Sequence, residues 1–292
     1  MIIGIIPARY ASTRFPGKPL IDIEGKSMIQ RVYEQAAQAK CLSRIIVATD
    51  DERIAAHVRS FGGEAIMTHS DHPSGTDRCW EAVKQIVNNE SIQNDELGMM
   101  NDESIQNDEY GTNAINSSFN IQHSSLNTQH SSLKYIINIQ GDEPFLAPEQ
   151  IDELGAILDG NVEIASQLIS VSDHEILFDE GEAKVIVNEQ FEAIYFSRQV
   201  IPFLKGIAKK DWHKHHAYYR QVGMYAYRAD VLEQITKLPV SPLERAESLE
   251  QLRWLQNGFK IKMTRTNYES HCIDTPEDVE KVLKMRAAGQ LI

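Results

Sequence analysis

The feature that most constrains the fold is an alternation of short β-branched runs with longer helical patterns near the start of the chain. Strand-like runs occupy residues 2–6, 44–49 and 64–68, and helical patterns occupy 27–39 and 52–61 between them. Because parallel strands need a crossover segment, this β-α-β-α-β order predicts a parallel sheet. Ligands of such sheets bind beyond the carboxyl ends of the strands, where we expect the functional residues.

The rest of the chain extends this pattern and then becomes richer in antiparallel signals. A helix is predicted over 75–88, and the apolar run 134–140 predicts a buried strand that ends in a turn at 141–144. Strands are also expected at 163–171 and 217–227, a hairpin at 185–197, and helices at 229–237, 243–257 and 276–288. We therefore predict a single α/β domain over 1–292: a Rossmann-like, mainly parallel sheet with helices on both faces and a smaller antiparallel portion.

Residues 88–133 interrupt this organisation with a segment of low complexity. ESIQNDE occurs at 90–96 and again at 103–109, and QHSSL occurs at 122–126 and again at 129–133. Such a composition buries too little apolar surface to offset the entropy lost on ordering. We expect an exposed, largely disordered insertion.

The charge balance limits the possible partners. With 29 Lys and Arg against 42 Asp and Glu, the formal net charge is −13. This argues against duplex DNA or an anionic membrane surface as the partner, and any phosphate must be bound by a local basic site.

The cysteines and the N-terminus predict a cytoplasmic protein. Cys41, Cys79 and Cys272 are an odd, scattered set, which we interpret as reduced, partly buried thiols. The N-terminal apolar run has no basic region before it, and no stretch approaches the roughly 20 apolar residues of a membrane span.

A basic loop follows the first predicted strand. The segment PARYASTRFPGKPL, residues 7–20, places Arg9, Arg14 and Lys18 among small and turn-forming residues such as Ser12. Clustered cations with backbone N–H groups free to approach suit a polyphosphate. A solvated surface loop is the alternative, because the segment matches neither of the common glycine-rich phosphate-binding motifs.

Seven segments of the chain, in order, resemble the blocks of the Kdo cytidylyltransferases, also called CMP-Kdo synthetases. They are PARYASTRFPGKPL (7–20), SGTDR (74–78), QGDEP (140–144), YFSR (195–198), GMYAYR (223–228), SPLERAESLEQLR (241–253) and IDTPEDVE (273–280). The resemblance implies a nucleotidyltransferase fold that uses Mg²⁺ and forms a homodimer. The implied reaction, in lipopolysaccharide synthesis, joins CTP and the eight-carbon sugar acid Kdo into CMP-Kdo and pyrophosphate as the anomeric hydroxyl attacks the α-phosphorus.

The resemblance also implies roles at the nucleotide. Arg9, Ser12 and Lys18 would hold the triphosphate, with Lys18 at the α-phosphate, and Arg78 would help bind the nucleotide. Asp142 and Asp274 would bind Mg²⁺, which prefers hard oxygen ligands; Lys18, Arg9, Asp142 and Asp274 would form the catalytic set. Local sequence leaves alternatives open: a turn-forming Asp142, an Asp274 that stabilises a helix dipole, and an Arg78 on a helix surface.

For the sugar acid, the resemblance implies a mixed polar set. Its members are Arg14, Gln140, Arg198, Gln221, Tyr225, Glu250 and Gln251. Helical spacing places Glu244, Glu247 and Gln251 on one face, which a solvated acidic stripe would also explain. Many members of the family have His where this chain has Gln221, and Gln cannot become charged. A related sugar acid, such as an amino-Kdo or a sialic acid, is therefore an alternative acceptor, and an inactive sugar-nucleotide-binding regulator is an alternative from another class.

Overall fold

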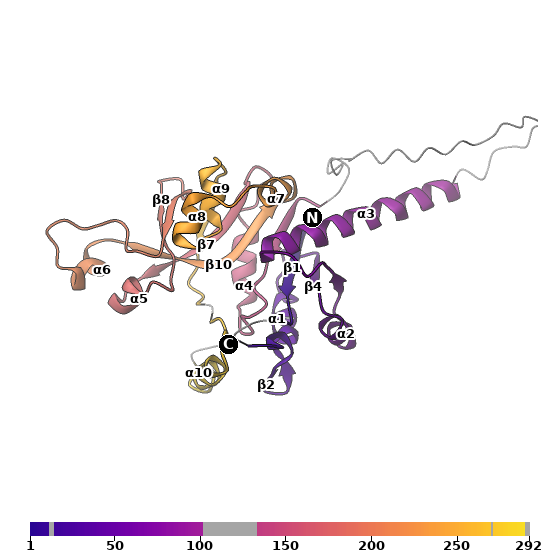
Figure 1. The fold of residues 1–292 in the computed structure, drawn as a ribbon, viewed down its shortest axis with the longest axis horizontal. Helices are drawn as coiled ribbons and strands as arrows, with labels where there is room; N and C mark the ends of the chain where they lie inside the picture. The colour runs from indigo at the N-terminus through magenta and orange to yellow at the C-terminus, as the bar shows by residue number, and fades with distance from the viewer. Residues whose placement is uncertain (12–14, 102–132, 270, 290–292) are drawn as a thin grey trace, which may run out of the picture.

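The computed structural model describes residues 1–11, 15–101, 133–269 and 271–289, with the backbone alone described for 90–101. Within these residues, nine strands form one mixed sheet (Figure 1). Its parallel part consists of β6 (Tyr135–Asn138), β1 (Ile2–Ala8), β4 (Arg44–Thr49) and β5 (Ala65–Met67), side by side in that order. The predicted parallel sheet is confirmed.

One long strand forms the antiparallel pairs in the middle of the sheet. β10 (Tyr218–Arg228) lies between β6 and β7 (Ile164–Val171) and runs antiparallel to both. Beyond β7, β11 (Ile261–Arg265) pairs parallel with it. The predicted hairpin forms from β8 (Lys184–Val187) and β9 (Ala193–Ser197), and β8 joins the sheet through β10.

Helices cover both faces of the sheet, as predicted. On one face lie α3 (Gly75–Asn101), α7 (Ala229–Thr236) and α9 (Gln251–Gln256). On the other lie α1 (Met28–Ala36), α2 (Glu52–Ser60) and α4 (Pro148–Gly155). Strand alternation explains the two cores, because Ile5 points to the first face and its neighbour Ile6 to the second.

The two ends of the chain share a third, smaller core. After β1 come the 3₁₀ turn η1 (Lys18–Leu20) and the short strands β2 (Asp22–Ile23) and β3 (Lys26–Ser27). The C-terminal helix α10 (Pro276–Ala287) packs on this region, so that Val282 joins Ile23 and Phe145 in one apolar cluster (Figure 1). This packing places the segment before α10 next to the loop that follows β1.

A fourth cluster lies at the end of the molecule where α5 (His174–Phe178) and α6 (Trp212–His215) project from the sheet (Figure 1). The 3₁₀ turn η2 (Lys209–Asp211) leads into α6. Trp212 is buried in this cluster and donates its indole N–H to the carbonyl oxygen of Ile207 at 3.0 Å. Burial of Trp212 therefore stabilises this projecting part of the chain.

Two predicted helices differ most from their expected bounds. The helix expected over 75–88 continues to Asn101, because this stretch contains no proline and extending a helix costs less than starting one. The insertion predicted at 88–133 therefore begins within this helix, and 102–132 lie outside the described residues. The helix expected over 243–257 is divided into α8 (Pro242–Glu247) and α9, because Ser248 between them has a left-handed φ of 53°.

The described helices include none that is both long enough and apolar enough to cross a membrane. All three cysteines are free thiols. Cys79 is buried and Cys41 half-buried, but Cys272 is exposed, so the expectation of partial burial is wrong for Cys272.

The turn after β6 yields a prediction on stability. A Cβ added to Gly141 would lie 2.8 Å from the backbone carbonyl oxygen of Pro7 in β1, and neither backbone can move freely. We expect Gly141→Ala to lower the free energy of unfolding by about 1–3 kcal/mol, measured by urea denaturation. Gly223→Ala is the matched control, because its added Cβ would meet nothing closer than 3.7 Å. A Gly141→Ala variant as stable as the control would contradict the close approach of the two strands.

Candidate active site

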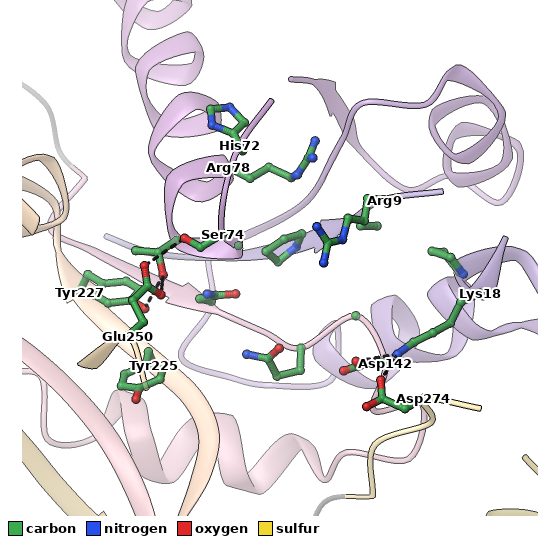
Figure 2. A pocket seen from close by; sticks show the side chains of 18 residues that line it. Arg9, Lys18, His72, Ser74, Arg78, Asp142, Tyr225, Tyr227, Glu250 and Asp274 are labelled. Carbon is green, nitrogen blue, oxygen red and sulfur yellow. Dashed lines mark hydrogen bonds and ion pairs between the residues drawn. The ribbon is translucent and has the colours of Figure 1, made fainter. Parts of the chain in front are cut away.

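A cavity of about 420 Å³ opens at the carboxyl ends of β1 and β6, where the parallel sheet predicts a ligand site. Pro7 and Asn138 line it from these strands, Tyr225 and Tyr227 line it from β10, and the first turns of α3 close it. Its volume is in the range of small-molecule sites. Figure 2 shows three groups of side chains around it.

Lys18 forms the first group with the two predicted metal-binding carboxylates. Its ammonium nitrogen lies 2.8 Å from Asp142 Oδ2 and 2.8 Å from Asp274 Oδ1. Burial of the ammonium lowers its pKa, but the two carboxylates outweigh burial and the net pKa of Lys18 is raised. Lys18 is therefore a permanent cation, and Asp142 and Asp274 converge on one point.

Backbone contacts hold these carboxylates together. The N–H of Ile273, a fully buried residue, donates to the carbonyl oxygen of Asp142 at 2.9 Å, which fixes the next residue, Asp274, beside Asp142. Thr275 and Asp278 form a capping box at the start of α10, and Asp278 Oδ2 also accepts the backbone N–H of Asp274 at 3.0 Å. Asp274 thus points to Lys18 from the residue before the cap of α10.

The basic loop reaches the cavity through Arg9 and Lys18, which both line it. Gly17, with a left-handed φ of 73°, donates its N–H to the carbonyl oxygen of Tyr10 at 3.0 Å and closes the loop. The guanidinium of Arg53 lies 3.4 Å from the centre of the Tyr10 ring and supports the loop from α2. Ser12 and Arg14 lie outside the described residues, so their predicted roles stay predictions.

Glu250 is the centre of the second group. It stands at the N-cap of α9, just after the break at Ser248. Its carboxylate accepts hydrogen bonds from Ser74 at 3.0 Å, from Thr76 at 2.8 Å and from Arg253 at 2.5 Å. Burial raises the pKa of Glu250, and these donors offset part of the rise. Glu250 is a fixed hydrogen-bond acceptor on the cavity wall.

Tyr225 continues the second group with two glutamines behind it. Gln221 Nε2 donates to the Tyr225 hydroxyl, and Gln221 Oε1 accepts from Gln251 Nε2 at 2.7 Å. Tyr225 and Gln140 line the cavity, whereas Gln221 and Gln251 do not. Burial raises the pKa of Tyr225, which keeps its phenol protonated.

Arg78 belongs to the third group, with His72. Its side chain is only 4% exposed, so the alternative of a helix-surface arginine is wrong. Nη1 donates to Thr68 Oγ1 at 2.6 Å and lies 3.5 Å from Asp50 Oδ1 at the end of β4. These contacts hold the guanidinium in place, and Arg78 is one of the residues that line the cavity.

Arg198 is the one described member of the predicted set that lies apart from the cavity and from its supporting network. Its guanidinium donates to four backbone carbonyls: to Glu247 at 2.8 Å, Glu180 at 3.0 Å, Gly181 at 3.2 Å and Ser248 at 3.4 Å. Here Arg198 stabilises two turns. Its predicted contact with the sugar acid stays a prediction.

Glu244, Glu247 and Gln251 do not form the solvated acidic stripe that their helical spacing also allowed. Glu247 accepts from Ser197 Oγ at 2.8 Å and from the Arg198 N–H at 3.0 Å, while Glu244 completes the capping box of α8 with Ser241. Gln251 is buried. These side chains are therefore bound to neighbours and do not form a solvated stripe, because the left-handed Ser248 breaks the helical spacing.

Sequence reasoning missed several lining residues. They are His72, Ser74, Thr76, Asn138 and Tyr227. The SGTDR segment could have indicated Ser74 and Thr76, because they precede Arg78 at the start of the same helix. Nothing in the local sequence marks His72, whose position depends on its hydrogen bond with Glu81.

Comparisons with known proteins agree over most of the chain. A family model described as cytidylyltransferase matches residues 3–107 and 99–262. The chain is 47% identical over 282 residues to the 3-deoxy-manno-octulosonate cytidylyltransferase of Cytophaga hutchinsonii, covering 96% of each. It is 46% identical over 290 residues to the protein of that name from Parabacteroides distasonis, covering 98% of each.

Solved structures show the same fold. The structure of CMP:2-keto-3-deoxy-manno-octonic acid synthetase complexed with CTP is 35% identical, covers 99% of both chains and superposes with a TM-score of 0.76. A cytidylyltransferase from Leptospira borgpetersenii is similar in fold alone, with 13% identity and a TM-score of 0.55.

The glutamine network behind Tyr225 yields a second prediction. Gln221→Leu leaves the buried Gln251 amide without its acceptor and the Tyr225 hydroxyl without its donor. We expect a loss of about 1–3 kcal/mol in the free energy of unfolding, measured by urea denaturation. Gln199→Leu, at an exposed residue that contacts Glu180, is the control and should cost less than about 0.5 kcal/mol. Equal stability of the two variants would contradict the network.

Proposed function

This chain belongs to the 3-deoxy-manno-octulosonate cytidylyltransferase family, and we propose from this premise that it transfers CMP from CTP to the anomeric hydroxyl of 3-deoxy-manno-octulosonate (Kdo). The products are CMP-Kdo, for lipopolysaccharide synthesis, and pyrophosphate. The observation that carries the proposal is the placement of the cation Lys18 between Asp142 and Asp274, with Arg9, in the cavity that opens beyond the parallel strands.

The reaction needs charge neutralisation and alignment more than covalent help from the protein. The anomeric hydroxyl oxygen forms a bond to the α-phosphorus, the hydroxyl proton is released, and the bond from the α-phosphorus to the bridging oxygen breaks with pyrophosphate as the leaving group. Negative charge on the phosphoryl oxygens is stabilised by fixed cations. Lys18, which stays protonated, and Arg9 are the residues placed to do this.

The proposal includes Mg²⁺, and the carboxylates fit it. Asp142 and Asp274 converge on one point, and they offer the hard oxygen atoms that Mg²⁺ prefers. The described residues hold no cluster of three or more His, Cys, Asp or Glu side chains, which suits an ion that takes its other ligands from water and substrate phosphates. When bound, Mg²⁺ would neutralise charge on the triphosphate.

The acceptor side of the proposal depends on Gln140, Tyr225 and Glu250. All three line the cavity, and they provide an amide, a phenol and a carboxylate for the hydroxyls of a polyhydroxy acid. Tyr225 and Glu250 lie across from Lys18 (Figure 2). Gln221 and Gln251 act behind them through Tyr225. An inactive regulator is not favoured, because Lys18, Asp142 and Asp274 are present and assembled. A different sugar acid is not favoured, because the similar curated proteins are named for 3-deoxy-manno-octulosonate.

A homodimer and a cytoplasmic location complete the proposal. Both are expectations from the sequence and its resemblance, and the three free cysteines agree with a reducing compartment. Light scattering after size exclusion tests the first, and a mass of one chain of 33.1 kDa would contradict it.

The proposed reaction predicts a specific assay result. Purified protein with CTP, Mg²⁺ and Kdo should release pyrophosphate, and the release should require the acceptor. In a panel with an amino-Kdo and a sialic acid, Kdo should give the highest kcat/KM. Pyrophosphate release no faster than in the absence of any acceptor would contradict the proposal.

The cation and carboxylate assignments predict the effects of single substitutions. Lys18→Met should lower kcat by about 100-fold or more, because it removes the cation that holds the phosphates, and Asp142→Asn should do the same, because it removes a carboxylate ligand of Mg²⁺. Lys237→Met is the control, since Lys237 forms an ion pair with Glu233 at 2.7 Å on the surface, and its kcat should be unchanged. Full turnover by Asp142→Asn would show that Asp142 does not bind the metal.

A further inference from the structure

The proposed reaction gives no role to His72, a polar side chain of the cavity. His72 lies beside Arg78 at one end of the cavity, while Lys18 and its carboxylates lie at another and Glu250 with the tyrosines at a third (Figure 2). If the triphosphate occupies the Lys18 end and the sugar acid the Glu250 side, the remaining end is left for the nucleoside. His72 and Arg78 would then face the cytosine base.

A carboxylate fixes the imidazole of His72. Nε2 is hydrogen-bonded to Glu81 Oε2, and the same oxygen accepts the backbone N–H of His69 at 2.9 Å. Gln85 Nε2 donates to the other oxygen of Glu81 at 3.3 Å. Burial raises the pKa of Glu81, but these donors outweigh burial and the net pKa is lowered, so Glu81 is an ionised acceptor.

This contact determines the tautomer of the ring. A carboxylate can only accept hydrogen bonds, so Nε2 carries the hydrogen and Nδ1 of the neutral ring carries a lone pair. No hydrogen-bond partner of Nδ1 is found in the described part of the chain, and the ring borders the cavity. His72 thus offers an acceptor at the same end of the cavity as the donor-only guanidinium that Arg78 contributes from α3.

A hydrogen-bond donor beside an acceptor matches the edge of cytosine but not that of uracil. The edge of cytosine presents acceptors at O2 and N3 and a donor at the N4 amino group, whereas uracil presents N–H at N3 and an acceptor at O4. A donor from Arg78 and an acceptor from His72 complement cytosine, and they face uracil with like groups at N3 and O4. We propose that His72, oriented by Glu81, is the residue that selects CTP over UTP by accepting a hydrogen bond from the N4 amino group.

The inference rests on the proposed function, and its test measures kcat/KM for CTP and for UTP with Kdo as acceptor. His72→Phe keeps a planar ring but removes the acceptor. We expect kcat/KM for CTP to fall about 10-fold while that for UTP is unchanged or rises, so that the CTP/UTP ratio falls by at least about 10-fold. His72→Gln, whose amide both donates and accepts, should bind CTP and UTP with similar affinity in calorimetry without an acceptor.

His69→Phe is the matched control, because the His69 side chain is 86% exposed and its ring nitrogen lies 4.0 Å from Glu81, while the hydrogen bond to Glu81 comes from the His69 backbone N–H. It should keep the wild-type CTP/UTP ratio. Loss of activity toward both nucleotides by the same factor in His72→Phe and His72→Gln would overturn the proposal, as would an unchanged ratio. Wild-type turnover of CTP and Kdo in the same experiment separates such a result from a failure of the proposed reaction.

Discussion

The site depends on one ammonium group shared by two carboxylates. Lys18 is 124 residues from Asp142 and 256 residues from Asp274 in the sequence, yet its nitrogen lies 2.8 Å from an oxygen of each. Removing one partner from a partly buried ion cluster leaves an uncompensated charge, so the three segments that carry these residues are held together. Two carboxylates and a cation are also the groups that the proposed reaction needs for a triphosphate with Mg²⁺.

Strand pairing and the packing of α10 bring these three residues together. β1 and β6 are neighbouring parallel strands, so the basic loop after one and Asp142 after the other emerge at the same edge of the sheet. Asp274 comes from the far end of the chain, and it arrives through α10 and the hydrogen bond from Ile273 to Asp142. The antiparallel strand β10 and the N-cap of α9 then supply the opposite wall with Tyr225 and Glu250.

Much of this could be predicted from sequence because it follows from periodicity and from ordered motifs. The alternation over residues 2–68 predicts the parallel sheet, and the resemblance places Lys18, Asp142 and Asp274 in one site. The break at Ser248 could not be predicted, because a non-glycine residue in a left-handed conformation leaves no pattern in the sequence. The carbonyl contacts of Arg198 and the pairing of His72 with Glu81 arise only when separate turns and helices pack, so residue type alone does not indicate them.

Lys18 and Asp274 are proposed to act as one unit on the triphosphate, and a double-mutant cycle on kcat/KM tests this coupling. Lys18→Met, Asp274→Asn and the double variant are compared with wild type in pyrophosphate release from CTP and Kdo. The account predicts that the double variant is about as active as the weaker single variant, because each substitution already disables the unit. Effects that multiply in the double variant would contradict it and show that the two residues act independently.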